Sequence, residues 1–297
     1  MSAFASPHIR LFTGAIMISF SPVFVNLAEV SPTTSGFYRV IIGGIALASF
    51  LVFTGRRLAF SRRAWLGIVG ASVFFSLDLW FWHRSIVYIG PGLSTLLANL
   101  QVFFMMAGGI LLLGQRPSAL QLVAVPLAVL GLAMIVGPDW DSGVPGYRLG
   151  VVFGVLTAMS YAGYMLCMRS ARLESAHAVP VREVAVMSLI VAAILGAAAV
   201  IEGESLAITR PIDIGWMLAY GLFCHALGLM FIASSLVKVS ATEVGIALLL
   251  QPSLSYVWDI VFFGRAVTPL EITGALVTLT AIFLGANLRS KQKQRAG

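Results

Sequence analysis

Long apolar runs alternate with short polar connections along almost the whole chain. Each run holds about 20 residues, which is the length that an α-helix needs to cross ~30 Å of hydrocarbon. The pattern predicts ten membrane-spanning segments, over residues 9–27, 33–54, 64–83, 91–113, 118–136, 148–168, 180–200, 212–235, 241–263 and 268–287. The connections between them are too short to hold a further domain.

Two of these segments resemble each other, and both carry polar residues near their centres. The run over residues 241–264 is interrupted by a Gln-Pro-Ser sequence that begins at Gln251, and residues 91–114 hold Gln101 at the corresponding place. Each Gln is followed thirteen residues later by the Gly that ends its run. Paired segments with a polar break are typical of transporters built from two related halves.

Ten segments divide into two halves of five. An odd number of spans in each half turns the second half upside down in the membrane relative to the first. We therefore expect an all-α integral membrane protein whose ten transmembrane helices form two inverted five-helix repeats around a central cavity. The first repeat is expected over residues 1–137 and the second over residues 148–288, followed by a basic cytoplasmic tail over 289–297.

Composition and charge agree with a membrane protein. Hydrophobic residues make up 59% of the chain and charged residues 10%, whereas a soluble domain has about 25% charged residues. The net charge of +7 does not indicate a nucleic-acid partner, because the basic residues lie in the short loops. With the N-terminus inside, 14 Lys and Arg residues fall in inner loops or the tail and 4 in outer loops, which predicts that both termini are cytoplasmic.

The sequence holds no catalytic or metal-binding motif. Phosphate-binding glycine loops, paired His and Glu on a helix, and nucleophile elbows are all missing from it. The two cysteines, Cys167 and Cys224, lie inside apolar segments and indicate small core residues. We therefore expect no enzyme activity, no cofactor and no metal.

Polar residues and prolines at membrane depth are the first candidates for function. Gln101 and Gln251 lie about ten residues into their segments from opposite sides, so both come near the midplane. Together with Asn99 they line a substrate site there, or they join helices by hydrogen bonds. Pro22 and Pro252 interrupt the helix ladder, and act either as hinges or as simple kinks.

Aromatic residues at helical spacing form a second group of candidates. Phe75, Asp78 and Trp82 share one face of the third segment, Tyr161 and Tyr164 lie in the sixth, and His225 lies in the eighth. Aromatic walls with a few polar groups suit an organic solute of medium size. For Trp82, a place in the aromatic belt at the membrane surface is the alternative.

Three charged residues inside the predicted spans allow three interpretations. Arg39, Asp78 and Asp259 are expected in the outer half of the membrane. Arg39 pairs with one of the two acids, as a structural ion pair or as part of a gate, or Asp78 couples transport to protons.

Taken together, the ten spans, the two halves, the Arg-rich loop after the second span, the Arg within that span and the helix–Gly–helix end of each half resemble the drug/metabolite transporter superfamily, EamA family. Within it, the chain resembles the YddG-type exporters of aromatic and other neutral amino acids. The resemblance implies a ten-helix basket, alternating access, and a central cavity lined by spans one, three, four, six, eight and nine. The positions that match are Phe24, Asp78, Trp82, Gln101, Tyr161, His225, Gln251 and Pro252.

We therefore expect a secondary transporter or facilitator that exports small organic metabolites, above all aromatic and neutral amino acids, across a bacterial inner membrane. The alternatives are an exporter of drug cations or nucleosides with the same fold and, more distantly, a membrane enzyme or receptor-like protein without transport. Membrane lipid is the expected surrounding, and the oligomeric state stays open, with a monomer compatible. The candidate substrate-binding residues are Ser21, Phe24, Phe75, Asp78, Trp82, Asn99, Gln101, Tyr161, Tyr164, His225, Gln251 and Ser253, and the candidate hinges are Pro22 and Pro252.

Overall fold

The structure is a computed structural model that describes residues 6–55, 59–114, 118–141, 143–174, 181–235 and 241–295. Within these ranges all regular secondary structure is helical. The helices are α1 (Pro7–Ser19), α2 (Ser21–Leu27), α3 (Pro32–Phe53), α4 (Arg62–Ile89), α5 (Pro91–Ala98), α6 (Gln101–Leu113), α7 (Ala119–Val136), α8 (Tyr147–Glu174), α9 (Val181–Ile201), α10 (Pro211–Leu218), the π-helix η2 (Ala219–Gly228), α11 (Leu229–Ser235), α12 (Ala241–Phe263) and α13 (Pro269–Arg295).

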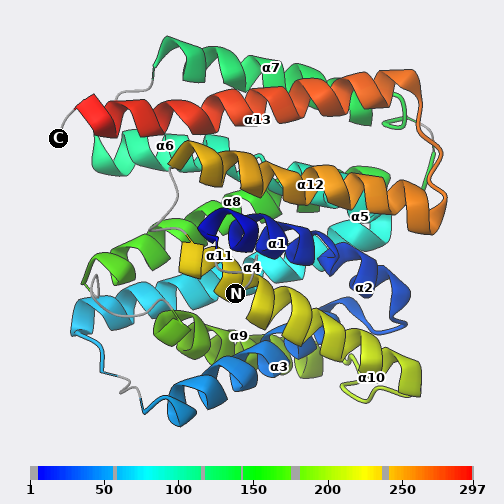
Figure 1. The fold of residues 1–297 in the computed structure, drawn as a ribbon. Coiled ribbons are helices and arrows are strands. Elements are labelled where there is room, and N and C mark those ends of the chain that lie inside the picture. The colour runs from blue at the N-terminus through cyan, green and yellow to red at the C-terminus, as the bar shows by residue number, and fades with distance from the viewer. Residues whose placement is uncertain are drawn as a thin grey trace.

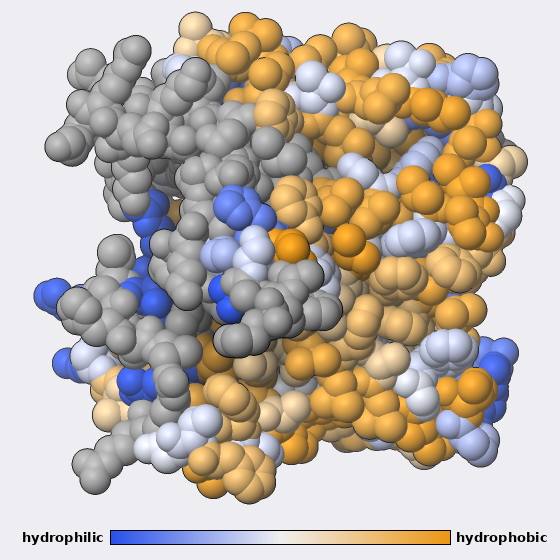
Figure 2. Space-filling view, in the orientation of Figure 1, coloured by the Kyte–Doolittle hydropathy of each residue, from blue (hydrophilic) through white to orange (hydrophobic). Residues whose placement is uncertain are grey.

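Eight stretches of the described residues are long and apolar enough to cross a membrane. They are the α1–α2 pair, α3, α4, the α5–α6 pair, α7, α8, α9, and the run from α10 through η2 into α11. In the view of Figure 2, apolar residues cover most of the described surface along the helices, and the strongly hydrophilic residues gather toward the ends of the bundle. The protein is therefore a multi-pass membrane protein, as its composition predicts.

Helices that are distant in the chain pack against one another. The most extensive pairings are α4 with α8, α3 with α9, and α7 with α13, and α1 lies between α11 and α12. In Figure 1, α7 and α13 lie side by side at one edge of the bundle, α3 and α9 lie toward the opposite edge, and the other helices fill the space between. Each of the three extensive pairings joins an early helix to a late one.

Glycine at two positions allows this close packing. A Cβ on Gly131 of α7 would lie 2.7 Å from the carbonyl oxygen of Gly274 on α13, and one on Gly43 of α3 would lie 2.9 Å from the carbonyl oxygen of Gly221 in η2. Both distances are too short for a side chain, so the backbones meet directly. Small residues at membrane-helix contacts serve this purpose.

The predicted ends of the segments agree with the helices to within a few residues, except at α4, α8 and α13, which continue beyond the predicted ends at 83, 168 and 287. The third segment was predicted to end at 83, but α4 continues to Ile89. Its added turns hold buried residues, among them Ile86 and Ile89. They continue because they pack inside the protein, where the width of the hydrocarbon sets no limit.

The helix in the first segment breaks two residues before Pro22, between α1 and α2. The backbone N–H of Phe20 turns to the Met17 carbonyl oxygen at 3.3 Å, and the Ser19 hydroxyl donates to Ile16 at 2.7 Å. Pro22 has no N–H for the preceding turn, which favours a break at this place.

The polar segments 91–113 and 241–263 differ in their continuity. Helix α12 runs through Pro252 without a break, whereas the fourth segment breaks at Asn99 and Leu100. The Asn99 side-chain amide donates to the Thr95 carbonyl oxygen at 2.8 Å, and the Asn99 backbone N–H turns to Leu96 instead. A side chain that competes for a helical acceptor explains the break better than a proline does here.

Candidate functional site

A charged residue inside the bundle organises the candidate site. Arg39 extends from α3 toward η2, where its Nη1 donates to the Tyr220 hydroxyl at 3.0 Å and its Nε donates to His225 Nδ1 at 3.4 Å. Beyond them, His225 Nε2 lies 2.8 Å from the Ser188 hydroxyl of α9, and Tyr220 lies 3.3 Å from His83 Nε2 of α4. This chain of polar contacts joins four helices.

The donors and acceptors of this chain are satisfied when both histidines are neutral. His225 Nδ1 accepts from Arg39, so the proton of His225 sits on Nε2 and is donated to Ser188. His83 Nδ1 lies 2.6 Å from the Leu79 carbonyl oxygen and donates to it, which leaves Nε2 to accept from Tyr220. Arg39 is then the cation that this network holds in place.

Aromatic rings surround the Arg39 guanidinium. Its Cζ lies 5.0 Å from the Tyr220 ring centroid and 5.9 Å from the centroids of Phe75 and Trp82, all within the range of a cation–π interaction. Phe75 and Trp82 both reach the Arg39 guanidinium because residues seven apart lie on the same face of helix α4.

Asp78 lies on that face of α4, between Phe75 and Trp82, and is 5% exposed. The Asp78 carboxyl group and the Arg39 guanidinium form no ion-pair contact within 4.0 Å. No residue in the described ranges donates a hydrogen bond to its carboxylate. The expected ion pair of Arg39 with Asp78 is therefore absent from the described contacts.

The second proposed partner of Arg39 is engaged elsewhere. Asp259 accepts the Gly92 backbone N–H at 3.0 Å, at the N-terminus of α5, and pairs with Arg265 at 3.4 Å. Arg265 in turn contacts Glu271 at 3.1 Å. Asp259 thus ties α5 to α12 and the start of α13, and the expectation that it pairs with Arg39 is wrong.

Six of the predicted site residues come together around Arg39. The Phe75 and Tyr164 ring centroids are 4.8 Å apart, those of Tyr161 and Tyr164 are 5.2 Å apart, and those of Phe75 and His225 are 6.4 Å apart. Trp82 is 7% exposed and packs inside the protein, so the alternative of a surface belt is wrong for it. The gathered residues are Phe75, Asp78, Trp82, Tyr161, Tyr164 and His225.

The remaining predicted residues lie on α2, around the break in the fourth segment, and on α12. Phe24 and Ser21 are on α2, and Phe24 stacks on Trp216 with 6.1 Å between ring centroids. Phe24 shares an apolar cluster with Trp82, which makes this group adjoin the residues around Arg39. The other positions are Asn99, Gln101, Gln251 and Ser253.

The polar atoms of this second group differ in how they are used. Asn99 uses its amide N–H within its own helix, whereas the Gln101 side-chain oxygen is buried and receives no hydrogen bond from a described residue. Gln251 is half-buried on α12, next to the buried Pro252. Helices α5 and α12 pack together.

Three members of the site were missed from the sequence: His83, Ser188 and Tyr220. Arg39 was expected in an ion pair or a gate, and not at the centre of the candidate site. Tyr220 and His225 share one buried side only because η2 is a π-helix, and nothing in the sequence indicated that change of helical period. Single π turns inside helices are frequently associated with functional sites.

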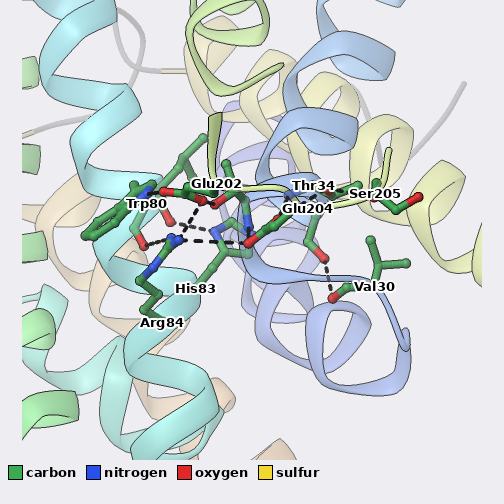
Figure 3. Close-up of polar contacts among 11 residues, drawn as sticks. Val30, Thr34, Trp80, His83, Arg84, Glu202, Glu204 and Ser205 are labelled. Carbon is green, nitrogen blue, oxygen red and sulfur yellow. Dashed lines mark hydrogen bonds and ion pairs between the residues drawn. The ribbon is translucent and has the colours of Figure 1, made fainter. Parts of the chain in front are cut away.

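Two carboxylates of the α9–α10 connection hold one end of the bundle together (Figure 3). Glu202 accepts hydrogen bonds from the Thr33 hydroxyl at 2.6 Å, from Trp80 Nε1 at 2.6 Å and from Arg84 at 2.8 Å. Glu204 accepts the Thr34 backbone N–H at 3.0 Å, at the N-terminus of α3. A carboxylate there satisfies helix donors and complements the helix dipole.

Hydrogen bonding also sets the charge state of Glu202. Partial burial opposes ionisation of Glu202, but the donors Thr33, Trp80 and Arg84 outweigh it and hold its pKa below the ordinary value. A lowered carboxyl pKa contributes stability that is present above the unfolded-state pKa of about 4.3 and is lost as the pH falls through the lower, folded-state value.

Replacing Glu202 and Glu204 together by Gln is expected to lower the melting temperature of the purified protein in detergent. Lost helix caps and charged hydrogen bonds should cost about 1–2 kcal/mol, and acidification of the wild type below about pH 4 should lower the melting temperature in the same direction. Asp141→Asn is the control, because Asp141 forms an exposed pair with Arg148. Equal melting temperatures for the double variant and the control would contradict this role.

Two hollows of the described structure lie away from the residues around Arg39. One, of about 390 Å³, is lined by residues between Trp140 and Leu149, and the other, of about 10 Å³, lies between α3, α9 and α11.

The described helices and the charged and aromatic residues buried among them define a multi-pass membrane protein with a functional site in its interior. The chain matches the EamA-like transporter family over residues 6–137 and 148–286, and it belongs to that family.

Individual relatives agree with this class. A Haemophilus influenzae protein named "Uncharacterized transporter" is 24% identical over 148 residues, which cover 48% of this chain and 48% of that protein, about half the length of each. A solved structure described as "Crystal structure of protein" has the same fold, with a TM-score of 0.67, 16% identity, and coverage of 98% of this chain and 100% of that one.

Proposed function

We propose that this protein is a secondary transporter that exports small organic metabolites, above all aromatic and other neutral amino acids, by alternating access. The observation that carries the proposal is the group of buried residues around Arg39, because a cation, an acid and several aromatic rings meet there inside a transporter fold. Ionisable groups at membrane depth are costly and mark substrate or ion pathways.

The helix pairings support two inverted repeats with ten spans. The third and sixth spans, α4 and α8, correspond in the other half to the eighth span, which includes η2 and α11, and to the first span, which includes α1. Helix α4 packs on α8, and η2 and α11 pack on α1 in the corresponding way. Exchanging each span for its counterpart in the other half leaves the α3–α9 and α7–α13 pairings unchanged. Helices α12 and α13 supply the ninth and tenth spans in this arrangement. A pseudo-two-fold axis in the membrane plane has this effect on a packing pattern.

The proposed setting is the bacterial inner membrane, with both termini in the cytoplasm, as the distribution of Lys and Arg favours. The network of Glu202 and Glu204 would then face the periplasm. In this arrangement it closes the outer end of the bundle and has to open for release of the substrate. Pro22 and Pro252 remain the proposed hinges of that movement.

Purified protein in liposomes is expected to take up radiolabelled L-phenylalanine and related neutral amino acids faster than empty liposomes do. The measurement is initial uptake across a panel of amino acids, nucleosides and an organic cation, with and without an imposed proton gradient. Glu243, Asp259, His225 and Asp78 are possible proton carriers on chemical grounds, and only the gradient experiment separates coupled from passive transport. Flux of the organic cation alone would overturn the amino-acid assignment and favour the drug-cation alternative.

The drug-cation alternative has one observation in its favour, which is the buried carboxylate of Asp78. Arg39 opposes it, because the guanidinium repels a cation that approaches the same face of α4. We therefore rank an amino acid, which carries both charges, above a cation.

A further inference from the structure

The Arg39 guanidinium has donors that the protein does not use. A guanidinium carries five N–H groups, and the described contacts of Arg39 use one, from Nε, on His225 and one, from Nη1, on Tyr220. The other three have no acceptor among the described residues. They are the donors of the fork that binds a carboxylate with two parallel hydrogen bonds.

The fork is held in place before any ligand binds. His225 is fixed by Ser188, and Tyr220, which is fully buried, is fixed by His83. Arg39 also lies against the rings of Phe75, Trp82 and Tyr220, which limit its movement. A side chain ordered in advance loses less entropy when it binds an anion.

Asp78 supplies a carboxyl group next to the same aromatic rings that surround Arg39. It follows Phe75 by three residues and precedes Trp82 by four, so it projects from the face of α4 that carries both rings in contact with Arg39. It is nine-tenths or more buried, with no donor from a described residue and no ion pair to Arg39. The Arg39 guanidinium and the Asp78 carboxyl group thus lie against one interior face without an ion pair between them. Arg39 keeps three unused donors beside its bonds to His225 and Tyr220, and Asp78 has no hydrogen-bond partner among the described residues.

Burying separated charges costs free energy that a matching ligand can recover. A zwitterion with a carboxylate and an ammonium group on neighbouring atoms complements both charges at once. Next to Asp78 and Arg39, the rings of Phe75, Tyr161 and Tyr164 form an apolar wall on which the side chain of the ligand can lie.

We propose that Arg39 and Asp78 form the recognition site for the head group of an α-amino acid, with the substrate carboxylate on the Arg39 fork and the substrate ammonium on Asp78. This inference rests on the proposed function, and it replaces Gln251 and Asn99 as the principal contacts of the head group. Gln251 and Asn99 remain candidates for other contacts. Rings on α4 and α8 hold the side chain of the substrate.

The first test uses the wild-type protein in detergent and three ligands that differ in one group. These are L-phenylalanine, 2-phenylethylamine, which lacks the carboxylate, and 3-phenylpropionate, which lacks the ammonium group. L-phenylalanine is expected to bind about 10- to 100-fold more tightly than either analogue, because each analogue leaves one buried charge unpaired. Equal binding of all three ligands would overturn the inference without any substitution.

The second test assigns each charge to its group. In Arg39→Gln the advantage of L-phenylalanine over 2-phenylethylamine should disappear, and in Asp78→Asn its advantage over 3-phenylpropionate should disappear. Arg39→Lys keeps the charge but not the fork, and should fall between wild type and Arg39→Gln. Thermal unfolding shows that each variant is folded before it is tested.

Outcomes for the inference and for the proposed function differ. If the wild type transports L-phenylalanine and both variants keep the wild-type order of the three ligands, the head-group site is wrong and the transporter assignment stands. If no amino acid binds to the folded wild-type protein, and none is transported by it across the liposome membrane, the proposed function itself is wrong. If each variant loses its preference for L-phenylalanine over the analogue assigned to it and keeps its preference over the other analogue, the result supports both the head-group site and the proposed function.

Discussion

Gly43→Ala is expected to reduce amino-acid transport about tenfold or more while the protein still folds. Gly43 lies one turn beyond Arg39 on α3, where a Cβ would come 2.4 Å from His225 Cδ2 and 2.9 Å from the Gly221 carbonyl oxygen. Neither atom can move easily, because one belongs to a ring fixed at both nitrogens and the other to the backbone of η2. The methyl group must therefore push η2 away from α3 and draw His225 off Arg39.

The expected magnitude follows from overpacking. Adding a methyl group to a filled interior costs typically 1–3 kcal/mol, and each 1.4 kcal/mol corresponds to a factor of ten in an equilibrium constant. Initial uptake by proteoliposomes measures the effect on transport, and thermal unfolding measures the effect on stability.

Gly215→Ala is the matched control for this substitution. Gly215 lies on α10, just before η2, and a Cβ there meets nothing within 4 Å. Its uptake should equal that of the wild type. Wild-type uptake by a folded Gly43→Ala protein would show that contact between α3 and η2 has no part in transport.

Among the proposed substitutions, Gly131→Val is expected to cause the largest loss of stability. A Cβ on Gly131 would meet the Thr278 hydroxyl at 2.4 Å, and the Gly274 carbonyl oxygen and the Thr278 backbone nitrogen at 2.7 Å each. Because two of these atoms are backbone, a branched side chain has to separate α7 from α13. The expected cost is about 2 kcal/mol or more, which lowers the melting temperature by roughly 5 °C or more.

Thermal unfolding in detergent is the measurement, and Leu130→Val is the control on the neighbouring position. Leu130 is 56% exposed on the outer side of α7, so its substitution should change the melting temperature little. An equal effect of the two substitutions would mean that the close contact of α7 and α13 is not what stabilises this edge of the bundle.

The membrane-spanning pattern could be predicted from the sequence because it depends on a one-dimensional property. An apolar run of about 20 residues has few alternatives to a spanning helix. The aromatic face of α4 was predictable for a similar reason, since residues three, four and seven apart share one side of a helix.

What could not be predicted depends on competition within one turn or on contacts between distant residues. Both Asn99 and Pro252 interrupt an apolar run, and only the hydrogen bond from Asn99 to Thr95 shows which of the two breaks its helix. The π-helix that turns Tyr220 and His225 toward Arg39 is not indicated by the spacing of apolar residues in the sequence. Glu202 and Glu204 read as ordinary loop acids, because their partners lie about 120 and 170 residues away in the chain.

The pairing of early helices with late ones affects how the chain is assembled during synthesis. Helices α3, α4 and α7 find their main neighbours in α9, α8 and α13, which leave the ribosome later. Until those helices arrive, Arg39 and Asp78 sit in the membrane without His225, Tyr220 or the rings of α8 around them. We therefore expect residues 6–137 not to fold stably without the second half, whose helices enclose the charged residues of the first.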